Sequence, residues 1–487
     1  MLKQLNINPW YIAVAFVLLN SLCFALEFWY FALVPAVLAV VYAAIRRLDW
    51  LILFIVACVP FSINTEAMDI GAGMYLPTEP LLAGVLLLFL FKLLSRDSID
   101  RRIFTHPVSV VVYAYLIWML ITSVTSELPL VSFKFTLVKM WFIAAFYFLL
   151  AHIFQREKNM RTFIMVYLFP LIIVIGYTVI RHASYGFDKD AGHWVMEPFF
   201  KDHTSYGAVL AMYLPVLLGL LFKKKMSNLL RAILLLALVV LVVGIVLSYT
   251  RAAWVSLVAA CALLVVMLLR VKLRTLIAGV AVMGAFVWFA QDDLRMALER
   301  NKQDSSDNLQ EHVQSISNVS SDASNLERLN RWNCALAMFN ERPVFGWGPG
   351  TYQFVYAPFQ RSGDLTIIST NNADGGNAHS EYLGPLSEQG LIGMLIMVIL
   401  VLVVARLAFN LAETIRNRDL RLLLLSAWLG LVTYFIHGIL NNYLDTDKAS
   451  APFWGFIAIL VAIDLFHRKS NSTAENVDQS REFSESI

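Results

Sequence analysis

The residues of this 487-residue chain best suited to chemistry lie in one polar segment, 321–393. Near its end, the run NAHSEYLGPLSEQGLIG contains His379 just before an apolar stretch. Arginines of the same segment precede it: Arg328, Arg331 and Arg342. A histidine can exchange a proton near neutral pH, and an arginine can bind an anion through paired hydrogen bonds. The segment is therefore expected to carry the chemistry of the protein.

A further candidate, Arg251, is the only charged residue between Ala232 and Leu269 and lies midway in SYTRAAWVSL. A cation between two apolar stretches is energetically unfavourable unless it reaches water, an acid or an anionic ligand. Arg251 is therefore a candidate for anion binding. The alternative is an arginine whose charged head reaches the lipid interface without any further role.

The composition indicates a membrane protein. Hydrophobic residues make up 59% of the chain and charged residues 15%, whereas soluble domains carry roughly 25% charged residues. The formal charge of +3 is too small to favour a nucleic-acid partner. Three of the four cysteines lie in apolar runs, so neither disulfides nor a metal knuckle is expected. The chain begins without a small-residue cleavage site, which predicts that its first apolar stretch is retained.

Apolar stretches of roughly 17–25 residues are candidate membrane spans. The sequence predicts an all-α polytopic membrane protein with about 14 transmembrane helices and one large, partly helical extracytoplasmic loop. The expected spans are 10–25, 28–45, 49–63, 78–94, 108–126, 136–155, 163–181, 204–222, 232–249, 252–269, 275–290, 389–408, 422–440 and 452–467.

Basic residues predict the orientation, because they are enriched in cytoplasmic loops near span ends. The clusters all follow even-numbered spans; they lie at Arg46 with Arg47, at 92–102, 156–161, 223–231, 270–274 and 406–421, and at Arg468 with Lys469. Both termini are therefore expected in the cytoplasm. The long loop is expected on the opposite face, where a bacterial cell has no ATP or nucleotide sugars.

These boundaries divide the chain into four parts. We expect an N-terminal transmembrane bundle (1–290), an extracytoplasmic catalytic loop (291–388), C-terminal transmembrane helices (389–467) and a disordered cytoplasmic tail (468–487).

Within the loop, 301–325 has the composition of a mobile linker. A helix is then expected, with Ser324 as N-cap and Glu327 three residues later, ending before Pro343. The glycines of the following turn, Gly346, Gly348 and Gly350, allow its backbone to come close to a partner. The turn lacks the Lys-Ser/Thr of a phosphate-binding loop and follows a helix, so it is weak evidence of a site on its own.

Each candidate also has a simpler explanation. Loop histidines are commonly solvated or structural, and Arg328 and Arg331 would lie on the polar side of the loop helix, where a solvated face accounts for them. Arg342 is similar. His379 is favoured by its neighbours Ser380 and Glu381 and by its position where the loop meets a span.

At these positions the sequence resembles the O-antigen ligase and polymerase superfamily of bacterial inner-membrane glycosyltransferases. The resemblance rests on TRAAW at a span end, on ERLNRWNCALAMFNERPVFGWGPGTYQF and on HSEYLGPLSEQGLIG. The last run fits the ligase pattern His-(Asn/Ser/Gln)-x(9)-Gly-x-x-Gly with His379, Ser380, Gly390 and Gly393. KDHTSYGAVLAMYLP, from Lys201, is weakly similar to a span of these proteins.

The resemblance implies transfer of a glycan from an undecaprenyl diphosphate donor to a sugar hydroxyl at the extracytoplasmic face of the inner membrane, with no metal, no cofactor and no nucleotide sugar. His379, Arg328 and Arg251 are the expected catalytic residues. Substrate binding is expected of a larger set: Arg331, Arg342, Gly346, Gly348, Gly350 and Ser380. The expected partners are the lipid-linked donor, a glycan acceptor, the bilayer and other polysaccharide-export components.

Three functions remain open from the sequence. The favoured one is a polymerase that joins lipid-linked units into O-antigen, exopolysaccharide or a teichuronic-type chain. A ligase that moves finished glycan onto a lipid A core uses the same chemistry. A lipid-linked glycan transporter belongs to another class, and such proteins tend to show broken helices and symmetry between halves, whereas this chain has one lopsided loop.

Overall fold

The computed structural model describes residues 9–28, 31–32, 34–65, 73–94, 99–289, 323–360 and 376–468. The chain forms two compact units, Met1–Phe54 and Ile55–Ile487. Most of the predicted linker, 301–322, and the predicted tail from 469 lie outside the described residues. Residues 323–325, also predicted as linker, belong to α16 instead.

The first unit consists of apolar helices. It contains α1 (Pro9–Ala25), α2 (Val34–Arg46) and the first part of α3 (Leu48–Cys58). Most of the described α1 side chains are exposed, as expected of a helix that is apolar around its whole circumference and faces lipid.

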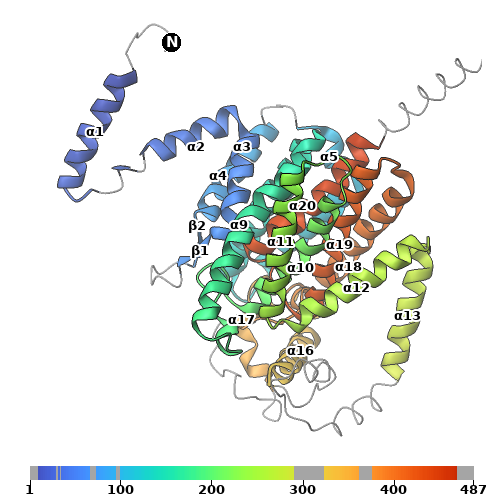
Figure 1. The fold of residues 1–487 in the computed structure, drawn as a ribbon. Helices are drawn as coiled ribbons and strands as arrows, with labels where there is room; N and C mark the ends of the chain where they lie inside the picture. The colour runs from blue at the N-terminus through green and yellow to red at the C-terminus, as the bar shows by residue number, and fades with distance from the viewer. Residues whose placement is uncertain are drawn as a thin grey trace, which may run out of the picture. The chain divides into compact units, whose positions relative to one another are not determined.

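The second unit is a helical bundle (Figure 1). Its longer helices are α4 (Thr78–Leu94), α6 (Pro107–Val124), α7 (Pro129–Ile143), α9 (Glu157–Ser184), α10 (His203–Leu221), α11 (Asn228–Leu247), α12 (Arg251–Leu268), α13 (Leu273–Phe289), α16 (Ala323–Glu341), α18 (Leu383–Thr414), α19 (Arg418–Leu440) and α20 (Asp447–Ala462). Shorter elements are α5 (Arg101–Thr105), α8 (Leu150–Ile153), α17 (Tyr352–Val355), the 3₁₀ turns η3 (Val59–Phe61), η6 (Ala191–His193) and η7 (Ala357–Phe359), and the π-helical turns η5 (Ala144–Leu149) and η9 (Ile463–His467). Two short strands, β1 (Ile63–Asn64) and β2 (Tyr75–Leu76), pair antiparallel.

Among the described residues, nine helices are long and apolar enough to cross a membrane. They are Pro107–Val124, Pro129–Ile153, Glu157–Ser184, His203–Leu221, Asn228–Leu247, Arg251–Leu268, Leu383–Thr414, Arg418–Leu440 and Asp447–His467. The predicted all-α membrane fold is confirmed. The predicted number of about 14 spans is not, because α1, α2, α3, α4 and α13 have 17 residues or fewer.

The centre of the second unit is formed by α10, α19 and α20. Helix α10 packs along α19, and α20 packs against α19 and the η5 turn. Every residue of α20 is buried, which explains why its sequence is apolar on all sides instead of along one stripe.

Two charged residues at the start of α20 are buried, and each makes two or more hydrogen bonds. Asp447 Oδ2 accepts hydrogen bonds from Ser62 Oγ and Thr78 Oγ1, both at 2.6 Å. Lys448 Nζ donates to the carbonyl oxygens of Val59 and Ser62, both at 2.8 Å. Buried charges persist where such partners compensate for lost hydration, so this pair fixes the start of α20 against η3 and α4.

The orientation predicted from the basic clusters is testable with fusions. A reporter that is active only outside the cytoplasm, fused after Asp307, is expected to be active, and the same reporter fused after Lys224 to be silent, because Lys223–Lys225 precede a span on the predicted cytoplasmic side. The measurement is reporter activity normalised to fusion protein level. Reversed signals would refute the orientation.

Candidate functional site

Helix α16 is held over the bundle by a small apolar core. Its buried face packs with the residues that follow it, so that Cys334, Ala335, Met338, Tyr352, Tyr356 and Ala378 form one cluster, against which Trp347, Val355, Phe359 and Leu383 pack. The helix ends at Glu341, before Pro343, as predicted. The apolar face therefore positions the polar face of α16, which carries Arg328.

The glycine-rich turn packs against the chain itself. Trp347 N donates to Ser387 O at 3.1 Å, and Gly348 N donates to Glu388 O at 2.7 Å. Gly348 has a φ of +110°, and a Cβ there would lie 1.9 Å from Ser126 Oγ. Glycine is therefore required for this close approach. Gly346 and Gly350 also have positive φ, and a Cβ there would lie 2.3 Å and 2.8 Å from the nearest protein atom.

The turn docks where α18 is broken. Gly390 has φ 68° and ψ −170° inside the helix, and a Cβ there would lie 2.1 Å from Val344 O. Leu391 N donates to Pro343 O at 3.0 Å, which replaces a lost intrahelical bond. The predicted span start at 389 thus coincides with this break, while the helix itself begins at Leu383.

His379 has an unusual backbone conformation. Its φ is +48°, a region that few non-glycine residues adopt. Its amide donates to Asn377 Oδ1 at 3.0 Å, and its carbonyl accepts from Trp332 Nε1 of α16 at 3.4 Å. Such strain is concentrated at functional sites, where the surrounding structure enforces it.

The surroundings of His379 keep its imidazole neutral. Burial, followed by the charges of Arg328 and Arg331, lowers the pKa of His379 to about 4; Asp202 and Glu327 act in the opposite direction. At neutral pH the ring is therefore uncharged and has a nitrogen lone pair free to accept a proton.

Arg328 lies where several polar elements converge. It is half-buried, and its charge acts on His379 as well as on His203 and His437. The fold therefore brings two of the predicted catalytic residues, Arg328 and His379, into one electrostatic environment with the start of α10 and the end of α19.

A hydrogen-bonded cluster beside this environment was not among the sequence candidates. Asp202 caps α10 by accepting from Ser205 N at 2.7 Å, and its Oδ1 also accepts from Thr204 Oγ1 at 2.5 Å and from Tyr443 OH at 3.4 Å. Thr204 Oγ1 and Tyr443 OH are themselves hydrogen-bonded. Tyr443 OH also donates to Asn441 Oδ1 at 3.3 Å.

Two sequence signals could have pointed to this cluster. Polar residues stand directly before the apolar run of α10, in KDHTSYG from Lys201, and between α19 and α20, in NNYLDTD from Asn441. The first segment has only a weak family likeness, and nothing in the sequence shows that the two segments meet.

The residues after His379 anchor the loop to the end of α19. Glu381 accepts hydrogen bonds from Tyr434 OH at 2.6 Å, Tyr443 N at 2.8 Å and Leu444 N at 2.9 Å. Burial nevertheless raises the pKa of the Glu381 carboxyl. Ser380 is 2% exposed, and its Oγ accepts from the amides of Tyr382 and Leu383. In this structure Ser380 thus holds the turn that leads into α18, and its predicted role in substrate binding stays a prediction.

Arg251 is fixed near the start of α10. It is the first residue of α12, and the preceding Thr250 donates from Oγ1 to His203 O at 2.8 Å. A Cβ on Gly207 of α10 would lie 2.6 Å from Thr250 Oγ1, so the start of α12 contacts α10 closely here. Arg251 thus shares the Asp202–His203 end of the bundle.

Arg331 and Arg342 stabilise the loop. Arg331 Nε is 2.6 Å from Glu327 Oε1 and its guanidinium lies 4.1 Å from the centre of the Tyr356 ring. Arg342 Nη2 is 2.7 Å from Glu127 Oε2, and its guanidinium stacks on Trp347 at 3.9 Å. These contacts account for both arginines structurally, and their predicted role in substrate binding stays a prediction.

No group of three or more His, Cys, Asp or Glu among the described residues could hold a metal ion. The metal-free chemistry implied by the family resemblance stays a prediction.

These features define a class: a polytopic membrane protein in which a helical loop holds a histidine and an arginine over one end of the bundle. Residues 236–398 match the family model described as O-Antigen ligase. The matched segment contains Arg251, Arg328, His379 and Gly390, and it covers about a third of the chain. The predicted resemblance to the O-antigen ligase and polymerase superfamily is confirmed. In a comparison with curated proteins, none matches the chain.

The apolar helices and the match indicate a multi-pass bacterial membrane protein, and residues 236–398 are similar to glycosyltransferase-like enzymes of O-antigen or polysaccharide synthesis.

Proposed function

We propose that the protein polymerises undecaprenyl diphosphate-linked oligosaccharide units by transferring a glycan to a sugar hydroxyl at the extracytoplasmic face of the inner membrane. The observation that supports this most is the shared environment of Arg328 and the neutral His379, inside the segment that matches the ligase family.

The chemistry needs a base and an anion-stabilising group. The acceptor hydroxyl oxygen attacks the anomeric carbon of the donor, and the bond between that carbon and the diphosphate oxygen breaks. His379 takes the hydroxyl proton. The diphosphate leaves with the electron pair of the broken bond, and Arg328 and Arg251 stabilise its negative charge through bidentate hydrogen bonds.

Donor binding would strengthen the base. Arg328 and Arg331 contribute to lowering the pKa of His379 to about 4, which makes the free imidazole a weak proton acceptor. A bound diphosphate offsets these positive charges, so the pKa of His379 rises toward its ordinary value of 6.5. The site would therefore become an effective base only with the donor in place.

This coupling predicts a particular pH dependence. In the free enzyme His379 is neutral above its pKa of about 4, so kcat/KM is expected to stay level from about pH 8 to about pH 6. It should fall only on further acidification, as His379 becomes protonated. kcat reports the donor complex, in which the pKa of His379 is raised, so on acidification kcat should begin to fall at a higher pH than kcat/KM does. Initial rates at limiting and saturating donor give both profiles.

An acidic limb of kcat/KM near pH 6.5, the same as that of kcat, would contradict the proposed action of the arginines on His379. Variants with changes far from His379 provide the control for acid denaturation, since they should share any loss that comes from unfolding.

A ligase is the second candidate, favoured by the description of the matching family as O-Antigen ligase. Glycan length in a deletion strain distinguishes the two: single lipid-linked units would indicate loss of a polymerase, and long unattached chains loss of a ligase. The third possibility, a transporter without catalysis, is tested with purified protein and lipid-linked units, because a transporter would leave the units unchanged in length and attachment.

A further inference from the structure

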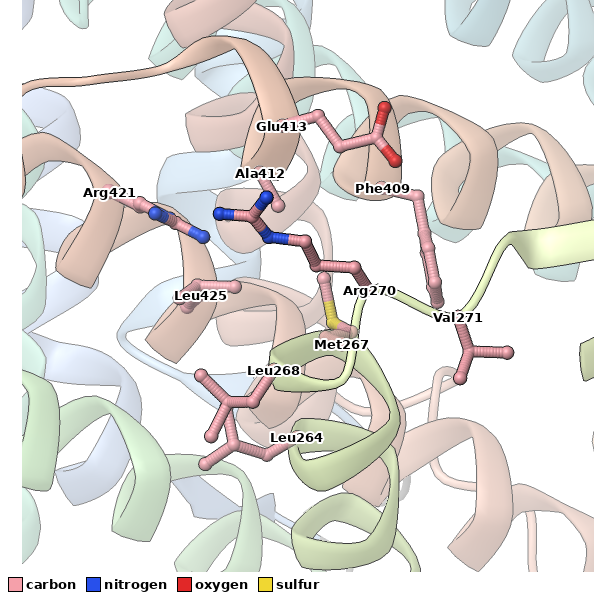
Figure 2. Close-up of a pocket in the computed structure, with 10 residues that line it drawn as sticks. All are labelled: Leu264, Met267, Leu268, Arg270, Val271, Phe409, Ala412, Glu413, Arg421 and Leu425. Atoms are coloured by element: carbon pink, nitrogen blue, oxygen red, sulfur yellow. The ribbon is translucent and has the colours of Figure 1, made fainter.

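A cavity lies at the other ends of α12 and α18 from the residues discussed above. The cavity has a volume of about 300 Å³ and lies between the end of α12, the end of α18 and the start of α19 (Figure 2). Arg251 begins α12 and His379 precedes α18, so the cavity belongs to a separate site. The basic clusters predict that this end of the bundle is cytoplasmic.

Two guanidinium groups face each other across this cavity. Figure 2 shows Arg270, which follows α12, pointing toward Arg421 of α19, while the carboxylate of Glu413 points away from both in this view. In the part of the chain that the structure describes, neither arginine side chain has an ion pair or a hydrogen bond. Two like charges that converge repel each other, so the arrangement is complementary to an anion.

The backbone at Arg270 supports a role for its side chain. Helix α12 ends in a Schellman arrangement: Val271 N donates to Val266 O and Arg270 N to Met267 O, both at 3.1 Å. The residue at the position of Arg270 must adopt a left-handed conformation, here with φ +57°, and glycine normally fills it. An arginine there costs about 1–2 kcal/mol of conformational energy. The charge of Arg270 therefore stands where backbone geometry alone favours glycine.

The remaining walls suit a lipid. The cavity is lined by apolar side chains, among them Leu264, Leu268 and Phe409, beside the two arginines. It lies at the level where three membrane-spanning helices end, which is the level of lipid headgroups. Glu413 supplies an acceptor for a headgroup hydroxyl.

We propose that this cavity binds the headgroup of an anionic phospholipid, whose phosphate oxygens accept hydrogen bonds from Arg270 and Arg421 while its acyl chains lie along the apolar wall. Paired arginines bind phosphate in a planar, bidentate manner, and basic pockets between helices at the cytoplasmic side of membranes suit such headgroups. Because the lipid would contact α12, α18 and α19 together, it would join the first of these helices to the other two.

The test measures lipid retention by the full-length protein. Purified protein is stripped of lipid in detergent and titrated with phosphatidylglycerol, with phosphatidylcholine or with inorganic phosphate, and binding is followed by native mass spectrometry and by the melting temperature. Phosphatidylglycerol is expected to bind and raise the melting temperature, phosphatidylcholine to bind about 10-fold more weakly, and inorganic phosphate to have no effect at the same concentration.

The variants separate binding from folding. Arg270→Gly removes the charge and relieves the left-handed strain, so the lipid-free protein should fold at least as well while its affinity for phosphatidylglycerol falls about 10-fold. Arg421→Gln should reduce the affinity for phosphatidylglycerol by a similar factor. Arg418→Gln removes an exposed arginine one turn away on α19 that does not line the cavity, so it should bind as the wild type does.

Unchanged phosphatidylglycerol binding in the double variant Arg270→Gly/Arg421→Gln would overturn the proposal. So would equal binding of phosphatidylcholine. An equal effect of inorganic phosphate would assign the site to a free anion instead of a lipid. Glycan transfer is not needed for any of these readouts, so failure here is distinguishable from failure of the proposed enzymatic function.

Discussion

Replacing His379 by asparagine is expected to reduce glycan transfer by a factor on the order of 10² to 10⁴, the usual contribution of a general base. Asparagine adopts the left-handed backbone conformation more readily than most residues, so it keeps the φ of +48° that the loop imposes but cannot take up the acceptor proton. Donor binding should change little, because the arginines that meet the diphosphate remain.

The measurement is the initial rate of transfer by purified protein, together with the affinity for the lipid-linked donor. His379→Ala should lose activity to the same extent but also some stability, since alanine is less tolerant of this backbone conformation. His152→Asn is a control for the same substitution elsewhere in the chain, because His152 lies in α8 and contacts Gln155. Wild-type rates in correctly folded His379→Asn would show that His379 is not the base.

The second large effect is expected at Arg251. We expect Arg251→Lys to retain a little activity, Arg251→Ala almost none and Arg251→Glu none, with weaker donor binding in each case. Lysine keeps the charge but loses the planar fork that matches a phosphate, and glutamate repels the donor. At a membrane surface the dielectric is lower than in water, so the charge interaction is worth more than an exposed pair.

The structure adds a physical reason for a role of Arg251. A cation in the first turn of a helix opposes the helix dipole, at a cost of about 0.3–1 kcal/mol, and Arg251 is the first residue of α12. The same dipole and the first amides of the helix favour an anion at this end. An anionic ligand would turn the unfavourable position of the arginine into a binding site.

Specific activity and protein level must both be measured for this series. If Arg251 only reaches the lipid interface, lysine should replace it fully, and alanine should lower the amount of protein more than its specific activity. Full specific activity in correctly inserted Arg251→Ala would leave the proposed diphosphate site without one of its two arginines.

Local patterns in the sequence were sufficient to predict the helices. Apolar runs gave the positions of spans such as α10 and α18 because an apolar helix in lipid needs no knowledge of its neighbours. The end of α16 before Pro343 followed from a local signal, whereas the predicted N-cap, Ser324, was wrong, because the helix begins at Ala323 and Ser324 lies inside it. The predicted number of about 14 spans is not confirmed, because described stretches such as that of α2, with 13 residues, form helices shorter than a single span needs.

The sequence by itself thus determined the fold class, the loop helix, the ligase-type pattern around His379 and the positions where glycine is required. Only the tertiary structure decided what those glycines approach: Gly346 approaches the broken helix α18, Gly348 approaches Ser126 and Gly350 approaches Phe135. It also decided that the guanidinium of Arg331 lies over the ring of Tyr356, and that Asp202 and Tyr443, 241 positions apart, meet beside Arg328. Such contacts depend on how distant helices pack, which periodicity and spacing along one chain do not encode.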